Sequence, residues 1–234
     1  MRLKYFLEYI NEEEKTSYKF TELPPDGKQN ALYKNANFNV EHEWWESIYE
    51  GFIEEMEELG VTVESKDIQF NGFSSQGDGA SFITSDIDTK IFMEKALEIE
   101  SNAYYDDGSE VDKEDEIQQL VGDLQDIGFD NREKVGPDDI TFEIYRTSNQ
   151  HAHEKSVTAD VDIEIPEHLF NSDDRDFQGF EKELREKITE WQVETCQKLY
   201  RKLNVDYDSL TSEKEITDSL ISNDYDFDIN GNII

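Results

Sequence analysis

The sequence predicts an α+β fold in which a small antiparallel sheet packs against several helices within a single domain. Two segments, 140–148 and 156–165, alternate apolar and polar residues as half-buried strands do. Two others, 42–59 and 176–204, carry apolar residues at helical spacing. A chain of 234 residues can bury one large core, and it shows no internal repeat or low-complexity linker, so one domain over 1–234 is expected.

The first third of the chain opens with two predicted short strands, 2–10 and 16–20. Thr21 and the prolines of TELPPDG then predict the start of a helix, with Thr21 as its cap. The next predicted helix, 42–59, ends at Gly60. Its expected core side chains are Trp45, Ile48, Tyr49, Phe52, Met56 and Leu59.

Residues 61–73 and 79–84 predict two strands, which are joined by the stretch GFSSQGDGASF (72–82). Further helices are expected at 89–103 and 112–127, with the acidic segment YYDDGSEVD between them.

The last third of the chain is dominated by the long predicted helix 176–204. A shorter helix, 212–222, is expected after a cap at Thr211 or Ser212, and YDFDINGN (225–232) predicts a strand and a turn. The candidate core residues of the long helix are Phe177, Phe180, Leu184, Ile188, Trp191, Cys196, Leu199 and Leu203.

Charge is the strongest global signal, since 57 acidic and 22 basic side chains give a net charge of −35. Aromatic residues make up 12% of the chain, which favours a folded, soluble protein over acidic disorder. Direct nucleic-acid binding and anionic membranes are disfavoured, because both need Lys and Arg. A halophilic surface would explain the charge, but the Lys, Asn and Ile content is that of an AT-rich genome.

Two predicted helices carry acidic stripes. On the first stripe no Lys or Arg lies between positions 41 and 58 to compensate the carboxylates. Such a stripe places a charge about every 5 to 6 Å, which is too sparse for one helix alone to imitate a DNA duplex. Solvated helix faces are the alternative interpretation. The stripes are Glu43, Glu46, Glu50, Glu54 and Glu57, and Asp112, Glu116, Asp123 and Asp126.

The glycine-rich stretch 72–82 allows three interpretations. Asp78 between Gly77 and Gly79 is typical of a tight turn in which glycines adopt positive φ. The polar residues Ser75 and Gln76, with Asp78, could instead form a binding surface. Catalysis would need a serine (Ser74, Ser75 or Ser81), Asp78 and one of two histidines, His151 or His153. The stretch contains no nucleophile elbow, P-loop or dinucleotide-binding pattern.

Metal-binding patterns are weak. DFDING (226–231) matches the opening of a calcium loop, but the closing Glu would fall after Ile234, so an Asn230–Gly231 turn is preferred. Asp160, Asp162 and Glu164 share one strand face, which is also the ordinary outward face of a strand. Cys196 is the single cysteine, which excludes an internal disulfide and fits a reducing cytosol. We expect no cofactor.

The motifs together resemble a phage and prophage family catalogued as "antitoxin of toxin–antitoxin stability system". The resemblance lies in YKFTEL (18–23), EWWESIYE (43–50), Gly60, IQFNGFSSQGDGASF (68–82) and YDSLTSEKEITDSLISNDYDF (207–227). It implies that 72–82 forms the family's signature turn and that Trp44 and Trp45 open its helix. It also implies a phage-type cytosolic protein without a known cofactor, and it supplies no reaction.

These observations lead to one expected function and two alternatives. The chain is expected to be a non-enzymatic phage protein in the host cytoplasm that binds and neutralises a host protein with a basic surface. A DNA mimic in the strict sense is one alternative, and a metal-dependent enzyme or small-ligand-binding protein that uses the loop is the other. The sequence leaves open whether the protein forms a homodimer. The expected contact residues are Glu46, Glu50, Glu54, Asp112, Glu116, Asp123, Ser75, Gln76 and Asp78.

Overall fold

The structure of the chain is a computed structural model that describes residues 17–96, 140–148, 152–164 and 174–234. The expected strand 2–10 and helix 112–127 lie outside these residues. The same holds for three of the expected contact residues, Asp112, Glu116 and Asp123.

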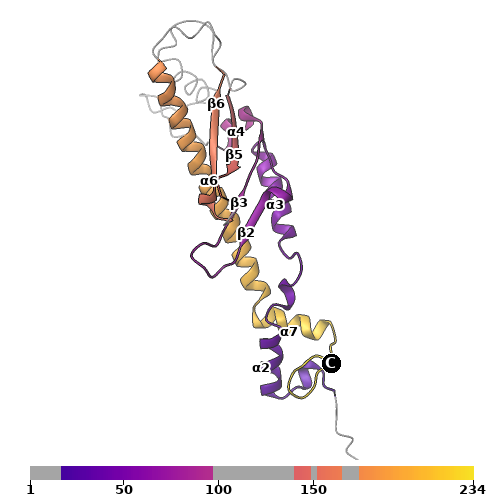
Figure 1. The fold of residues 1–234 in the computed structure, drawn as a ribbon. Coiled ribbons are helices and arrows are strands. Elements are labelled where there is room, and N and C mark those ends of the chain that lie inside the picture. The colour runs from indigo at the N-terminus through magenta and orange to yellow at the C-terminus, as the bar shows by residue number, and fades with distance from the viewer. Residues whose placement is uncertain (1–16, 97–139, 149–151, 165–173) are drawn as a thin grey trace, which may run out of the picture. The chain divides into compact units, whose positions relative to one another are not determined.

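The described residues form five α-helices and three two-stranded antiparallel sheets, which confirms the α+β class (Figure 1). The helices are α2 (Pro25–Lys34), α3 (Glu46–Glu58), α4 (Thr89–Lys95), α6 (Asp174–Leu210) and α7 (Glu213–Ser222). The strand pairs are β1 (Val61–Thr62) with β4 (Asp86–Ile87), β2 (Ile68–Asn71) with β3 (Gly79–Phe82), and β5 (Ile140–Arg146) with β6 (Val157–Ile163).

The chain divides into two compact units. Unit 1 comprises Met1–Glu46 and Leu203–Ile234, and unit 2 comprises Ser47–Lys202. The expectation that 1–234 forms a single domain stays a prediction.

In unit 2, the β2–β3 hairpin lies between α3 and α6. All four residues of β3 are buried, and the ring of Phe82 meets Phe52 of α3 and Trp191 of α6 in edge-to-face contacts with centroid distances of 5.3 and 6.1 Å. Phe92 of α4 packs on the same tryptophan at 4.7 Å and on Phe142 of β5 at 4.6 Å. Aromatic packing of this kind therefore joins helices and strands that are far apart in the sequence.

The predicted helix 42–59 starts four residues later than expected, at Glu46. Trp44 and Trp45 precede the helix, because the backbone N–H of Trp44 donates to His42 and that of Glu46 donates to Glu43 in successive turns. Gly60 ends the helix as predicted, with a φ of +75°.

The predicted strand 61–73 is two strands in the structure. A 3₁₀ turn, Ser65–Asp67, separates β1 from β2, so β1 pairs with β4 while β2 pairs with β3. The predicted pair 140–148 and 156–165 is confirmed as β5 and β6. Buried and exposed residues alternate along most of both strands, as the pattern predicted, and only Arg146, Thr158 and Ile163 are of intermediate burial.

The candidate core of the long helix is largely confirmed. Leu184, Ile188, Cys196 and Leu199 are buried in unit 2 and Leu203 in unit 1, while Trp191 is half-buried. The side chains of Phe177 and Phe180 lie outside the description.

Unit 1 joins segments from the two ends of the chain around its own core. Tyr18 forms a single β-bridge with Phe227, so the strand predicted at 16–20 is reduced to one residue pair. Lys19 forms ion pairs with Asp224 and Asp226 at 3.1 and 3.2 Å. The buried core residues are Phe20, Leu23, Ala31, Ile216, Leu220 and Phe227.

The helix start predicted at Thr21 is wrong. Thr21 lies inside a 3₁₀ turn, Phe20–Glu22, and α2 starts only at Pro25, with Pro24 as its N-cap. The tight turn allows Phe20 and Leu23 to point into the same core, and Pro25 fits the first helical position because it lacks the N–H that would be unpaired there. The predicted cap of α7 is confirmed, since Ser212 accepts a hydrogen bond from the N–H of Glu215 at 3.3 Å.

The C-terminal segment forms the predicted turn around Asn230 and Gly231. The carboxylate of Asp228 accepts hydrogen bonds from the N–H groups of Asn230 and Asn232, each at 2.9 Å, and Phe227 pairs with Ile233. The acidic side chains of the calcium-like pattern are thus used within the fold, because Asp226 pairs with Lys19.

Candidate functional site

The exposed side of α3 carries a row of carboxylates, Glu50, Glu54 and Glu57, which we name the α3 acidic face. Tyr49, Phe52 and Met56 bury the opposite side of the helix. The three glutamates follow each other at intervals of four and three residues and are all exposed. Glu46, also exposed, begins the same row at the first residue of the helix.

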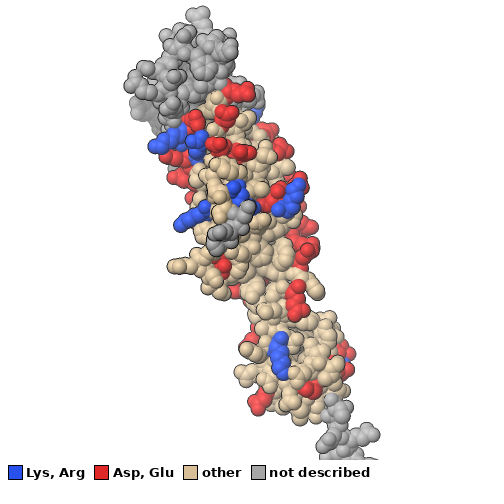
Figure 2. Space-filling model, in the orientation of Figure 1, with Lys and Arg blue, Asp and Glu red and all other residues tan. Residues whose placement is uncertain are grey.

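The lysines near α3 do not neutralise this face. Lys202 pairs with Glu55, and the ammonium of Lys95 donates to the backbone oxygen of Glu58 at 2.9 Å. Within the part of the chain that the structure describes, Glu50, Glu54 and Glu57 form no ion pair. Figure 2 shows acidic side chains along the edge of unit 2 where α3 runs.

The loop between β2 and β3, residues 72–78, is held by Asp78. One oxygen of its carboxylate, Oδ2, accepts hydrogen bonds from the N–H groups of Ser74 and Ser75, at 2.7 and 2.6 Å. A carboxylate that accepts two backbone N–H groups fixes the loop as an anion fixes a backbone nest. The side chains of Ser75 and Gln76 at the tip are exposed.

The loop is a turn, as one of the three interpretations expects, but the glycine with positive φ is not one of those beside Asp78. Gly77 and Gly79 beside Asp78 do not adopt positive φ, whereas Gly72 does, at +31°. A Cβ atom on Gly72 would lie 2.6 Å from Oδ2 of Asp78, so the carboxylate needs the glycine beneath it. Asn71 closes the base of the loop, since its amide oxygen accepts from the N–H of Gly79 at 3.2 Å.

An aromatic stack packs against the loop. The ring of Phe73 stacks on Phe70 of β2 and on Tyr200 of α6, with centroid distances of 5.8 and 5.5 Å. The hydroxyl of Tyr200 donates to the backbone oxygen of Gly72 at 3.2 Å. Sequence reasoning missed Tyr200, because nothing in the sequence relates it to a loop 128 residues away.

The structure does not bring the two groups of expected contact residues together. Figure 1 shows the loop projecting from the side of the β2–β3 hairpin away from α3. The α3 acidic face and the expected contact residues of the loop therefore lie on different surfaces of unit 2. These loop residues are Ser75, Gln76 and Asp78.

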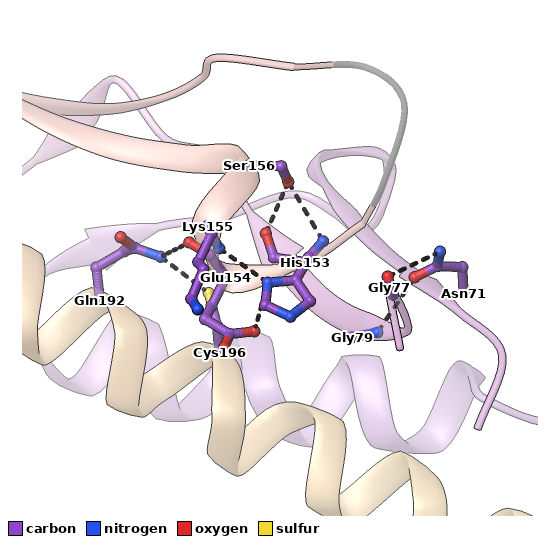
Figure 3. Close-up of polar contacts among 9 residues, drawn as sticks. All are labelled: Asn71, Gly77, Gly79, His153, Glu154, Lys155, Ser156, Gln192 and Cys196. Atoms are coloured by element: carbon purple, nitrogen blue, oxygen red, sulfur yellow. Dashed lines mark hydrogen bonds and ion pairs between the residues drawn. The ribbon is translucent and has the colours of Figure 1, made fainter. Parts of the chain in front are cut away.

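His153 lies next to Gly79, at the end of the loop, on the turn that leads into β6 (Figure 3). A Cβ atom on Gly79 would lie 3.0 Å from the Cα of His153, so the two backbones are in contact. The imidazole Nδ1 is 3.0 Å from the carboxylate of Glu154 and 3.2 Å from the N–H of Lys155. A neutral Nδ1 accepts from Lys155, and a protonated one donates to Glu154.

Within the described residues, His153 does not form the contact with a serine that nucleophilic catalysis requires. Among the described residues, no hydrogen bond joins the imidazole of His153 to a serine of the loop, and His151 lies outside them. The thiol of Cys196 is fully buried and accepts from the side-chain amide of Gln192 at 3.3 Å. Burial raises the pKa of Cys196 to about 11, so at neutral pH it is a protonated core residue rather than a nucleophile.

Three acidic side chains lie on the exposed face of β6 and of the residue that follows it: Asp160, Asp162 and Glu164. Asp160 pairs with Arg185 of α6 at 3.1 Å. The described ranges contain no group of three or more His, Cys, Asp or Glu side chains arranged to hold a metal ion. In the same ranges no helix is long and apolar enough to cross a membrane.

Comparisons with known proteins identify the family but not a function. No curated protein matches the chain, and no solved structure matches it. One family model matches residues 44–213, which cover most of the chain, including α3, the loop and Tyr200. The chain therefore belongs to the family described as Domain of unknown function (DUF8835).

Proposed function

We propose that this protein is a non-enzymatic inhibitor that binds a basic surface of a host protein through the α3 acidic face. The observation that carries the proposal is the exposure of Glu50, Glu54 and Glu57 without a compensating cation among the described residues. The net charge of −35 extends the same electrostatic preference to the whole chain. The resemblance to phage antitoxin-like proteins supports an antitoxin or anti-defence role in the host cytoplasm.

The local energetics of α3 support a binding role for this face. Like charges at intervals of three or four residues destabilise a helix by about 0.2–0.5 kcal/mol per pair. Glu57 and Glu58 also lie in the last turn, where the helix dipole disfavours a negative charge and where α3 has no basic residue. A basic partner would remove both penalties, and it would be attracted from a distance at low salt.

A strict DNA mimic is the narrower form of this proposal. The α3 acidic face spans about 10 Å at 1.5 Å per residue, whereas duplex DNA carries a charge about every 1.7 Å of its axis. One helix therefore covers too little length, and a second acidic surface would be required.

An enzyme or small-ligand-binding protein that uses the loop is the weaker alternative. Asp78 would have to act on a substrate, but its Oδ2 already accepts two backbone N–H groups. The geometry therefore favours a structural role for this carboxylate.

The decisive experiment compares two charge-reversed variants that have the same net charge. The first carries E50K, E54K and E57K on α3. The second carries lysines in place of three exposed acidic residues of the β5–β6 sheet face and its continuation, Glu143, Asp162 and Glu164. Each tagged protein is used to capture host proteins at low and at molar salt, and the affinity of the captured partner is then measured.

We expect the α3 variant to lose at least about tenfold in affinity at low salt, since each exposed ion pair contributes up to about 1 kcal/mol. The sheet variant should keep most of its affinity. Equal losses of affinity in the two variants would show that net charge, and not the α3 acidic face, determines binding. Unchanged affinity of the α3 variant would refute the proposal.

A further inference from the structure

Helix α3 contains a glycine on its exposed side, next to the α3 acidic face. At about 100° per residue, Gly51 lies about 60° around the helix axis from Glu54. A Cβ atom on Gly51 would meet nothing within 4 Å among the described residues, so the space outside this glycine is open. The φ angle of Gly51 is not positive. Within the described part of the chain, neither packing nor backbone conformation therefore requires a glycine at this position.

Other glycines of the fold have a structural reason. Gly60 ends α3 with a positive φ, Gly72 lies beneath the carboxylate of Asp78, and Gly231 lies against the backbone of α2. Glycine is the least favourable residue after proline in the interior of a helix. Helix α3 therefore combines two unfavourable features on its exposed side, the glycine and the row of like charges. A partner that lies against this side would offset both.

The spacing of the carboxylates indicates which kind of element fits this side of α3. At 1.5 Å per residue, Glu54 and Glu57 lie about 6 and 10.5 Å along the axis from Glu50. Basic residues at positions i, i+4 and i+7 of a second helix repeat the same two distances. Residues on one face of a strand recur about every 6.6 Å, so a strand matches the first distance and misses the second.

We propose that the α3 acidic face binds a basic α-helix of the partner protein and that this helix packs directly on Gly51. The inference rests on the proposed function and deepens it, because it names the element of the partner and adds an uncharged contact. The distance between two packed helices depends on the side chains at their contact, so a glycine allows a close approach. On the other side of Gly51, Glu55 is already paired with Lys202, so the cations of the partner are directed to the unpaired row.

The test uses the full chain and three alanine-based peptides of about 20 residues, long enough to form a helix. All three contain the same number of lysines. In the first peptide the lysines recur at i, i+4 and i+7 along one side, and in the second they are spread around the helix. The third keeps the first order but has a central proline that breaks the helix. We expect the first peptide to bind at least about fivefold more tightly than the other two, measured by fluorescence anisotropy at low salt.

Gly51→Gln is the decisive variant, since glutamine fills the open space, adds no charge and is a good helix former. The change should raise the thermal midpoint of the protein. It should also lower the affinity for the first peptide by about tenfold, because the added side chain holds the two helices apart. Ser209→Gln, at an exposed position of α6, is the matched control and should leave the affinity unchanged.

The charge-reversed variant E50K/E54K/E57K separates this inference from the proposed function. If it loses the first peptide while Gly51→Gln binds as the wild type does, the inference is refuted and the proposed function stands. Equal affinities of the three peptides for the wild type would likewise refute the inference alone, because lysine charge would then suffice without a helix. Unchanged binding of the first peptide by E50K/E54K/E57K would refute both.

Discussion

Gly231 of the C-terminal turn lies directly against Gly27 of α2, backbone to backbone. A Cβ atom on Gly231 would overlap the carbonyl oxygen of Gly27 and lie 2.9 Å from the nitrogen of Ala31. A Cβ atom on Gly27 would in turn lie 2.7 Å from the carbonyl oxygen of Ile229. Two segments about 200 residues apart in the sequence are therefore in direct backbone contact. The space between them cannot hold even a Cβ atom.

Gly231→Ala should therefore destabilise the protein strongly. Gly231 has a φ of +78°, where alanine is strained by about 1 kcal/mol, and the overlap with α2 adds to that strain. We expect a loss of at least about 2 kcal/mol in the free energy of unfolding, measured by urea denaturation.

Gly51→Ala is the matched control. Gly51 lies inside α3, and a Cβ atom there would meet nothing within 4 Å. Alanine should stabilise the helix by about 0.5–1 kcal/mol. If both substitutions destabilised the protein to the same extent, close packing at Gly231 would not be the cause.

Asp78→Ala should destabilise the loop between β2 and β3. The change removes the acceptor for the N–H groups of Ser74 and Ser75, although water replaces part of this interaction because the loop is exposed. The expected loss is about 1–2 kcal/mol in the free energy of unfolding, comparable to the loss of a helix cap. Ser75→Ala keeps the backbone N–H and should be nearly neutral, so equal effects would argue against the carboxylate's role.

Glu57→Lys should raise the stability of the protein while it weakens binding to a basic partner. The change removes the repulsion with Glu54 and places a cation in the last turn of α3, where the helix dipole favours it. We expect a gain of about 1 kcal/mol, read from the thermal midpoint at low salt. The gain should shrink in molar salt, because screening weakens exposed charges; a gain independent of salt would contradict the electrostatic explanation.

Asp228 should make the C-terminal turn sensitive to acid. The hydrogen bond from the Asn232 side-chain amide, with others from the backbone, holds the pKa of Asp228 below its ordinary value. A carboxyl group whose folded pKa is depressed stabilises the fold above its unfolded pKa, about 3.9, and this contribution is lost as pH falls through the folded pKa.

The stability advantage of the wild type over Asp228→Asn should therefore narrow on acidification below about pH 4. Asn232→Ala should raise the NMR-measured pKa of Asp228 toward the ordinary value. A carboxyl pKa that stayed unchanged in Asn232→Ala would show that the turn does not act through this hydrogen bond.

Cys196 should report global unfolding of unit 2. Its thiol is fully buried, and burial raises its pKa to about 11, so the folded protein should react with an aromatic disulfide reagent at pH 8 far more slowly than a free thiol does. Modification should accelerate with urea in step with the unfolding curve. Rapid modification under native conditions would show that α6 opens locally.

The fold class and most of the helices and strands follow from local patterns in the amino-acid sequence. Periodicity identified α3, α6, β5 and β6, because helices and strands repeat their buried positions at 3.6 and 2 residues. Gly60 marked the end of α3, and the pair Thr211 and Ser212 marked the start of α7, through local backbone chemistry. The exposure of Glu46, Glu50 and Glu54 also followed from the pattern alone, since they lie opposite the apolar stripe.

Features that depend on contacts between distant segments could not be predicted from local patterns. The start of α2 moved from Thr21 to Pro25, because Phe20 and Leu23 share a core with α7 and Phe227. Tyr200 contacts the loop, whereas the α3 acidic face lies on a different surface. The reason is that α6 and α3 pack on the β2–β3 hairpin from different sides. No local pattern encodes such relations, since they arise only when side chains far apart in sequence are packed into one volume.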